Sequence, residues 1–134
     1  MGQQQLLLIV LGVIIVGIAV VVGINLFNAN AESSAKDGIV SDCTNLAAMA
    51  QQFYKKPVSM GGGGRAFNTS NGAPSAWDIP TSLASTANGT YTATVAAKTV
   101  TITGVGTELV DGTNYVTHQA VVDSIGKIVV TKVH

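Results

Sequence analysis

Residue types that could do acid–base, nucleophilic or metal chemistry are sparse in this chain. It holds 134 residues with seven Lys and Arg, seven Asp and Glu, two His and one Cys. Neither His118 nor His134 has a Cys, Asp or Glu at the spacing of metal ligands, so each is expected on the surface or in packing. No nucleophile is paired with a base. The sequence therefore predicts no catalytic residue, no cofactor and no bound metal, and favours a protein that is not an enzyme.

Two loop motifs invite a binding interpretation. Asp111-Gly112-Thr113-Asn114 could offer oxygen atoms to calcium, but it has too few carboxylates for a strong site, and an ordinary turn is expected. The run from Gly61 to Gly64 lacks the Lys-Ser/Thr pair and the preceding strand of a phosphate-binding loop. Neither motif predicts a ligand.

Covalent modification is the remaining chemistry. Asn68-Thr69-Ser70 and Asn88-Gly89-Thr90 are acceptor triplets for N-linked glycan, so Asn68 and Asn88 are candidate glycosylation sites. Cys43 is the single cysteine, which excludes an intrachain disulfide. It lies on an apolar helical stripe and is expected to be a buried, inert thiol, with an intersubunit disulfide or a redox role as the alternative.

The element that dominates the chain is an apolar run from Leu6 to Ile24. As a helix these nineteen residues span roughly 28 Å, close to the 30 Å hydrocarbon core of a bilayer. Secretory signal peptides have shorter apolar cores and a basic start, and the start here has no Lys or Arg. The first charged residue is Glu32. A membrane-spanning segment is predicted.

The helix is predicted to continue well beyond the run. No proline occurs before Pro57, and apolar residues recur at steps of three and four from Ile39 to Tyr54. One helix is expected from near residue 2 to about Lys56, with Gly38 as its weak point. Its first half is apolar on all sides, and its second half is amphipathic and should cover a sheet.

A Gly- and Ser-rich loop and a sheet are predicted to follow. Residues 57–88 carry turn signals, and Phe67, Trp77 and Ile79 are expected to pin this loop to the core. From Gly89 the apolar period becomes two, which indicates four antiparallel strands. The predicted fold class is α+β, with residues 1–31 as an apolar helix and residues 32–134 as a head, in which the helix packs on a four-stranded meander.

This combination resembles the type IV pilins. The resemblance covers the architecture, and its sequence motif lies in about the first thirty residues. It implies a mature N-terminal residue that is N-methylated, for which Met1 is the candidate; the alternative is cleavage after Gly2, which leaves Gln3 first. It also implies that residues 1–31 anchor the subunit in the membrane before assembly and form the filament core afterwards.

The chain departs from the usual pilin pattern at several positions. Gln5 stands where most pilins have Glu, and it keeps an acceptor oxygen without the charge that is costly to bury. A helix-breaking proline and a carboxyl-terminal cysteine pair are absent. Gln5, Gly12, Gly17 and Gly23 are the expected assembly contacts, because small residues let helices approach closely. The stretch from Gly17 to Gly23 is expected to bend or lose regular hydrogen bonding in the assembled state.

The function that the resemblance implies is structural. The chain would be the major subunit of an extracellular filament on the cell surface. Its partners would be copies of itself, the inner membrane before assembly, and a pilus assembly machinery. Adhesion, motility, DNA uptake and secretion stay open as roles. The alternatives are a pseudopilin of a secretion system and a membrane-anchored binding domain. A net charge of zero gives no sign of a nucleic-acid partner.

Overall fold

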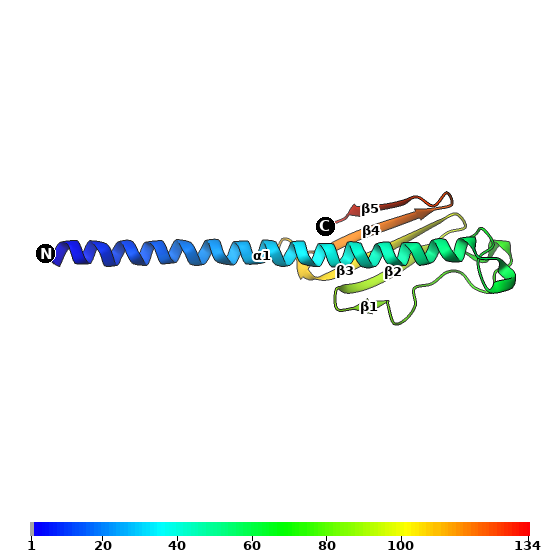
Figure 1. The fold of residues 1–134 in the computed structure, drawn as a ribbon, viewed down its shortest axis with the longest axis horizontal. Coiled ribbons are helices and arrows are strands. Elements are labelled where there is room, and N and C mark those ends of the chain that lie inside the picture. The colour runs from blue at the N-terminus through cyan, green and yellow to red at the C-terminus, as the bar shows by residue number, and fades with distance from the viewer. Residues whose placement is uncertain (1) are drawn as a thin grey trace.

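One helix, α1, runs through more than a third of the chain. The computed structural model describes residues 2–134, and α1 extends from Gly2 to Lys55 (Figure 1). Its 54 residues correspond to a rod about 80 Å long. The helix ends beside Pro57, which has φ −62° and ψ 150°, an extended conformation that cannot continue a helix. The predicted end near Lys56 is thus confirmed to within one residue.

The two halves of α1 have different surroundings. The first half projects alone, and the second half lies along the sheet (Figure 1). The residues of α1 that are buried occur at steps of three and four and form one stripe: Ile39, Cys43, Leu46, Ala47 and Ala50. This spacing confirms the predicted amphipathic second half, because positions three and four apart share one face of a helix.

The sheet has five strands rather than the four predicted. The strands are β1 (Ser85–Thr86), β2 (Gly89–Val95), β3 (Thr99–Leu109), β4 (Tyr115–Asp123) and β5 (Ile128–Lys132), all antiparallel and in sequential order. The additional strand is β1, whose two residues pair with Thr90 and Gly89. Two residues are too few to show a period of two, so the sequence pattern could not reveal this strand. The α+β class and the antiparallel meander are confirmed.

The two faces of the sheet differ in character. The face toward α1 is apolar and carries Val100 and Ile102 of β3 and Val116, Ala120 and Val122 of β4. The opposite face is rich in Thr. Gly104 lets the helix approach closely, because a Cβ there would lie 2.8 Å from Ile39 and from Tyr91. The missing side chain therefore makes room for the buried stripe of the helix.

Two short 3-10 helices, η1 (Val58–Met60) and η2 (Thr69–Asn71), lie in the loop between α1 and β1. The loop is fixed at the far end of the head, where Phe67, Trp77 and Ile79 are buried as predicted. Its glycine run closes the end of α1, since the N–H groups of Gly63 and Arg65 donate to the carbonyls of Phe53 and Tyr54. These carbonyls belong to the last turn of the helix, which otherwise lacks partners. We call this end of the head the tip and the end near Glu32 the neck.

Candidate assembly surface

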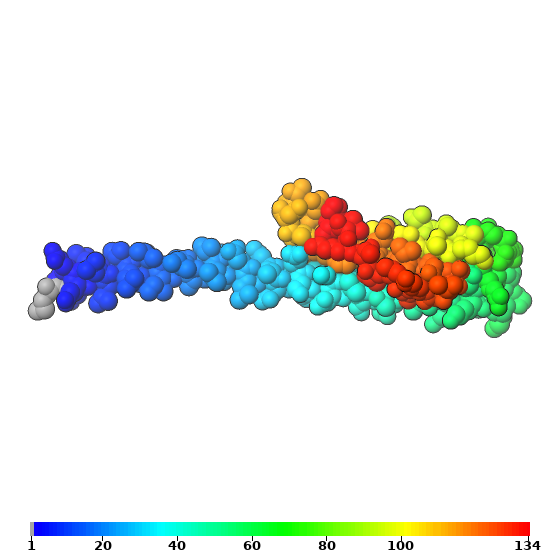
Figure 2. Space-filling view, turned by 90° about the horizontal axis from the view of Figure 1, so that it is seen from above, coloured from blue at the N-terminus to red at the C-terminus, as the bar shows by residue number. Residues whose placement is uncertain are grey.

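The largest exposed feature of the molecule is the apolar half of α1. Every large apolar side chain from Leu6 to Phe27 is exposed, with exposed fractions between 53% and 75%. A single copy buries none of this surface, which forms an uncovered rod (Figure 2). Soluble monomers rarely leave so large a continuous apolar surface in water. The rod therefore has to be covered by lipid or by other chains.

A bilayer fits the rod by length and composition. Within residues 2–134, α1 is the one helix that is long and apolar enough to cross a membrane, and its most apolar 18-residue window has a mean hydropathy of 3.3. A signal sequence near an N-terminus has similar properties. The helix continues without a break from its apolar half into the core of the head.

Most of the predicted assembly contacts lie on one side of the rod. At about 100° per residue, Gln5, Gly12 and Gly23 fall within about 20° of one line along the helix, together with Ala19. We call this line the small-residue face. Gly17 lies about 140° around the helix from it. A Cβ at Gly12, Gly17 or Gly23 would meet nothing within 4 Å in a single copy, so these glycines leave open space for a neighbour.

The small-residue face points away from the head. The same rotation places Ile39, Leu46 and Ala50, which contact the sheet, about 160–180° from Gly12. A straight helix thus presents its sheet on one side and its small residues on the other. Met1, the candidate for methylation, lies outside the described residues. The helix of the single chain is regular through Gly17 to Gly23, and its bending in an assembled state stays a prediction.

A cluster of hydrogen bonds to Asp42 joins α1 to the β1–β2 hairpin. Its Oδ2 atom accepts hydrogen bonds from the Tyr91 hydroxyl at 2.6 Å, the Asn88 Nδ2 at 3.0 Å and the Thr86 hydroxyl at 3.1 Å. Partial burial alone would raise the pKa of Asp42, but these three donors outweigh it and hold the pKa below its usual value. Burial and the nearby Asp42 together raise the pKa of Tyr91, which therefore stays a donor.

The two candidate glycosylation sites are placed differently. Asn88 is exposed, but its Nδ2, the atom that would carry a glycan, donates to Asp42. Its side chain also occupies the space beside Gly38, where a Cβ would lie 2.7 Å from Asn88 Oδ1. Asn68 is half-buried and caps η2, because its Oδ1 accepts from the backbone N–H of Ser70. Both asparagines thus have structural contacts, and glycosylation at either stays a prediction.

Cys43 and His118 lie in the core between helix and sheet. Cys43 is fully buried, as predicted, and burial followed by the charge of Asp42 raises the pKa of its thiol to about 11. His118 is 2% exposed, and its Nδ1 has no hydrogen-bond partner among the described residues. Burial, with the charges of Lys36 and Lys132, lowers the pKa of His118. The Cys43 thiol therefore stays protonated and the His118 imidazole stays neutral, and both side chains serve as packing groups.

The Asp111 loop forms a turn. The Oδ1 atom of Asp111 accepts hydrogen bonds from the backbone N–H groups of Thr113 and Asn114, and its Oδ2 atom accepts one from Asn114 Nδ2. These bonds hold the pKa of Asp111 below its usual value. Within residues 2–134 no three His, Cys, Asp or Glu side chains gather in a group that could hold a metal ion.

Two features of the site were missed from the sequence. The period of two in β4 places His118 in line with the inward-facing Val116 and Ala120, so the alternation could have predicted its burial. The partners of Asp42 lie more than forty residues away along the chain, and no local pattern indicates them.

The comparisons with known proteins give no relative for this chain. No family model matches it, no curated protein is significantly similar to it, and no solved structure matches its fold. The shared features with pilins are therefore those of architecture: a long apolar N-terminal helix that continues onto an antiparallel sheet.

Proposed function

We propose that this protein is the structural subunit of an extracellular, type IV pilus-like filament. Before assembly the rod of α1 spans the cytoplasmic membrane, and after assembly the rods of many copies form the filament core. Met1 is the proposed site of N-methylation, and the assembly machinery is the proposed partner that moves the subunit from membrane to filament. The same apolar surface is covered first by lipid and then by protein.

The observation that carries this proposal is the continuity of α1. An exposed apolar rod and a helix that covers the sheet are one regular element without a flexible linker. A plain membrane anchor needs only to hold its domain near the bilayer, and a flexible joint suffices for that. A filament requires every head to have a fixed orientation relative to the core, and a continuous helix provides it.

The direction of the small-residue face supports the same arrangement. Gly12, Ala19 and Gly23 lie opposite the sheet, so rods that pack through this face place their heads outward. Gln5 lies on the same side and would enter the core with them. Heads on the outside and small residues on the inside are what a solid cylindrical polymer requires.

The test is electron microscopy of material sheared from cells that express the full chain, compared with a chain that lacks residues 1–28. The full chain is expected to form thin, unbranched filaments, and the truncated chain is expected to stay in the soluble fraction as a monomer. The matched control is Ser33→Ala, an exposed position of α1 beyond the apolar run, which should assemble normally. Filaments from the truncated chain would refute the role of the rod. Membrane-bound full chain that never forms filaments would favour the membrane-anchored binding domain.

A further inference from the structure

Charge is distributed unevenly between the two ends of the head. Five of the seven basic residues lie at the tip, namely Lys55, Lys56, Arg65, Lys98 and Lys127. Five of the seven acidic residues lie in the neck half, namely Glu32, Asp37, Asp42, Glu108 and Asp111. From Glu32 to Lys55 the helix rises by about 35 Å, whereas charges are screened within about 8 Å at physiological ionic strength. The two ends therefore act as separate patches of opposite sign.

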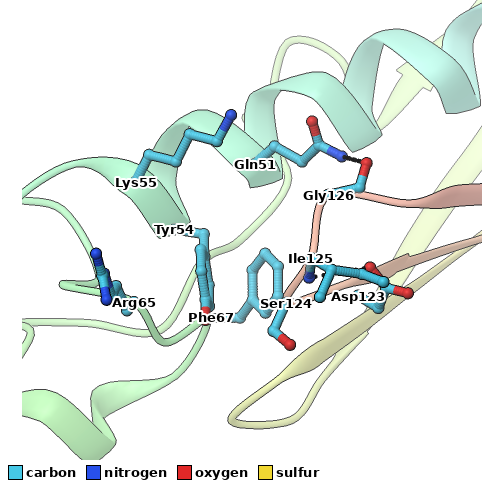
Figure 3. A pocket seen from close by; sticks show the side chains of 9 residues that line it. All are labelled: Gln51, Tyr54, Lys55, Arg65, Phe67, Asp123, Ser124, Ile125 and Gly126. Atoms are coloured by element: carbon cyan, nitrogen blue, oxygen red, sulfur yellow. Dashed lines mark hydrogen bonds between the residues drawn. The ribbon is translucent and has the colours of Figure 1, made fainter.

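The basic tip contains a hollow of about 370 Å³. It is lined by Gln51, Tyr54, Lys55, Arg65, Phe67 and the β4–β5 turn 123–126. Figure 3 shows Lys55 and Arg65 on one side of this hollow and the β4–β5 turn on the other. The side chain of Gln51 links α1 to the turn by donating a hydrogen bond to the carbonyl of Gly126. The carboxylate of Asp123 already accepts the backbone N–H groups of Ile125 and Lys127. Hydrogen bonds from neutral N–H groups do not cancel the charge of a carboxylate, so the lining holds two cations, Lys55 and Arg65, and one anion, Asp123, and is basic on balance.

The acidic neck carries a projection. In Figure 2 the connection between β3 and β4 stands out from the body of the head near the neck. It begins after Leu109, the last residue of β3, and contains Asp111, and Glu108 lies at its base next to Leu109; the side chains of Glu108 and Asp111 are exposed. The hydrogen bonds that Asp111 accepts within its own turn favour its ionised form. Lys36 and Lys132 are also in the neck half, and both are exposed; their charges act on the nearby His118. The neck half therefore holds five acidic residues against two basic ones.

From this complementarity we infer that the β3–β4 projection of one copy docks into the basic hollow at the tip of a second copy. The inference rests on the proposed function, because subunits that all point the same way along a filament place tip against neck. Such a head-to-tail contact joins two different surfaces and does not close on itself, so it repeats along the polymer. The partner copy would be displaced along the axis by about the length of the head, near 35 Å. The charges would also select parallel neighbours, since tip against tip brings like charges together.

The experiment uses filaments of the full chain and reverses one charge at a time. Arg65→Glu puts an anion into the hollow, and Lys132→Glu makes the same change of net charge at the neck. The Arg65 side chain is suited to this test because the bonds of residue 65 are made by its backbone N–H and carbonyl. Arg65→Glu is expected to raise the concentration of unassembled subunit left after pelleting by roughly threefold to tenfold. Lys132→Glu is expected to leave this concentration unchanged or to lower it.

A charge swap separates docking from misfolding. Glu108→Arg combined with Arg65→Glu restores opposite charges across the proposed contact and should return assembly toward that of the unchanged chain. Thermal unfolding of Arg65→Glu in detergent should match that of the unchanged chain. Equal assembly of Arg65→Glu and Lys132→Glu would overturn the docking contact. The contact would also be overturned if the double variant assembled worse than Arg65→Glu alone and worse than Glu108→Arg alone. Either result leaves the filament itself in place, whereas an unchanged chain that forms no filaments overturns the proposed function.

Discussion

Replacement of Asp42 by alanine tests how the helix is held to the hairpin. The Oδ2 atom of Asp42 accepts hydrogen bonds from Tyr91, Asn88 and Thr86. Asp42→Ala removes the acceptor from all three donors. The Tyr91 side chain is 3% exposed, so its hydroxyl has little access to water as a substitute partner.

The cost follows from the burial of each donor. A buried hydroxyl left without an acceptor costs about 1–3 kcal/mol. Asn88 is exposed and Thr86 is half-buried, so both can turn to water. Alanine also favours the helix over aspartate by about 0.5 kcal/mol. The expected net loss is about 2 kcal/mol, which lowers the melting temperature of a head of about 100 residues by roughly 8–16 °C.

The assay is thermal unfolding of the full chain in detergent, followed by circular dichroism at neutral pH. Asp37→Ala removes an exposed carboxylate from the same helix and serves as the matched control. Tyr91→Phe combined with Asp42→Ala should cost less than the sum of the two single changes, because both remove the same bond. If Asp42→Ala melts within 2 °C of the Asp37→Ala control, the assignment of the hydrogen-bond cluster as a stabilising contact is wrong.

The Asp42 cluster also has a pH dependence with a defined sign. The folded pKa of Asp42 lies below its usual value of 3.8. Its contribution to the free energy of unfolding is therefore present above pH 3.8 and is lost as the pH falls through the folded pKa. The difference between the unchanged chain and Asp42→Ala should narrow in acid over that window.

Three further changes test the core and the rod. Gly104→Ala should destabilise the head by about 1–3 kcal/mol in chemical denaturation, because its Cβ would lie 2.8 Å from Ile39 and Tyr91; an unchanged midpoint would argue against close packing there. Because the folded pKa of His118 lies below 6.5, the unfolded chain takes up the proton first, and the melting temperature should fall as the pH drops below 6.5. If the melting temperature of His118→Leu falls equally below pH 6.5, protonation of His118 is not the cause. Gln5→Leu should yield more filament than Gln5→Lys, which buries an unpaired charge at a cost of several kcal/mol; equal yields would place residue 5 outside the core.

Much of the fold was predictable because it depends on local periodicity. The absence of proline before Pro57 and the apolar steps of three and four determine one long helix, and its boundary was placed within one residue. The period of two after Gly89 determines the strands from β2 to β5. The predicted burial of Phe67, Trp77 and Ile79 is confirmed, whereas Met60 of the same loop is exposed.

Only the tertiary structure decided which residues meet across the chain. The bonds from the hairpin to Asp42, the close approach at Gly104 and the hollow between Arg65 and the β4–β5 turn all join segments far apart in sequence. The short strand β1 likewise exists only because β2 pairs with it. The sequence by itself determined that an apolar rod leads into an amphipathic helix and a small sheet, because each of these elements shows as a repeat of apolar residues between near neighbours in the chain. Contacts between distant segments depend on register and packing in three dimensions, which no local period specifies.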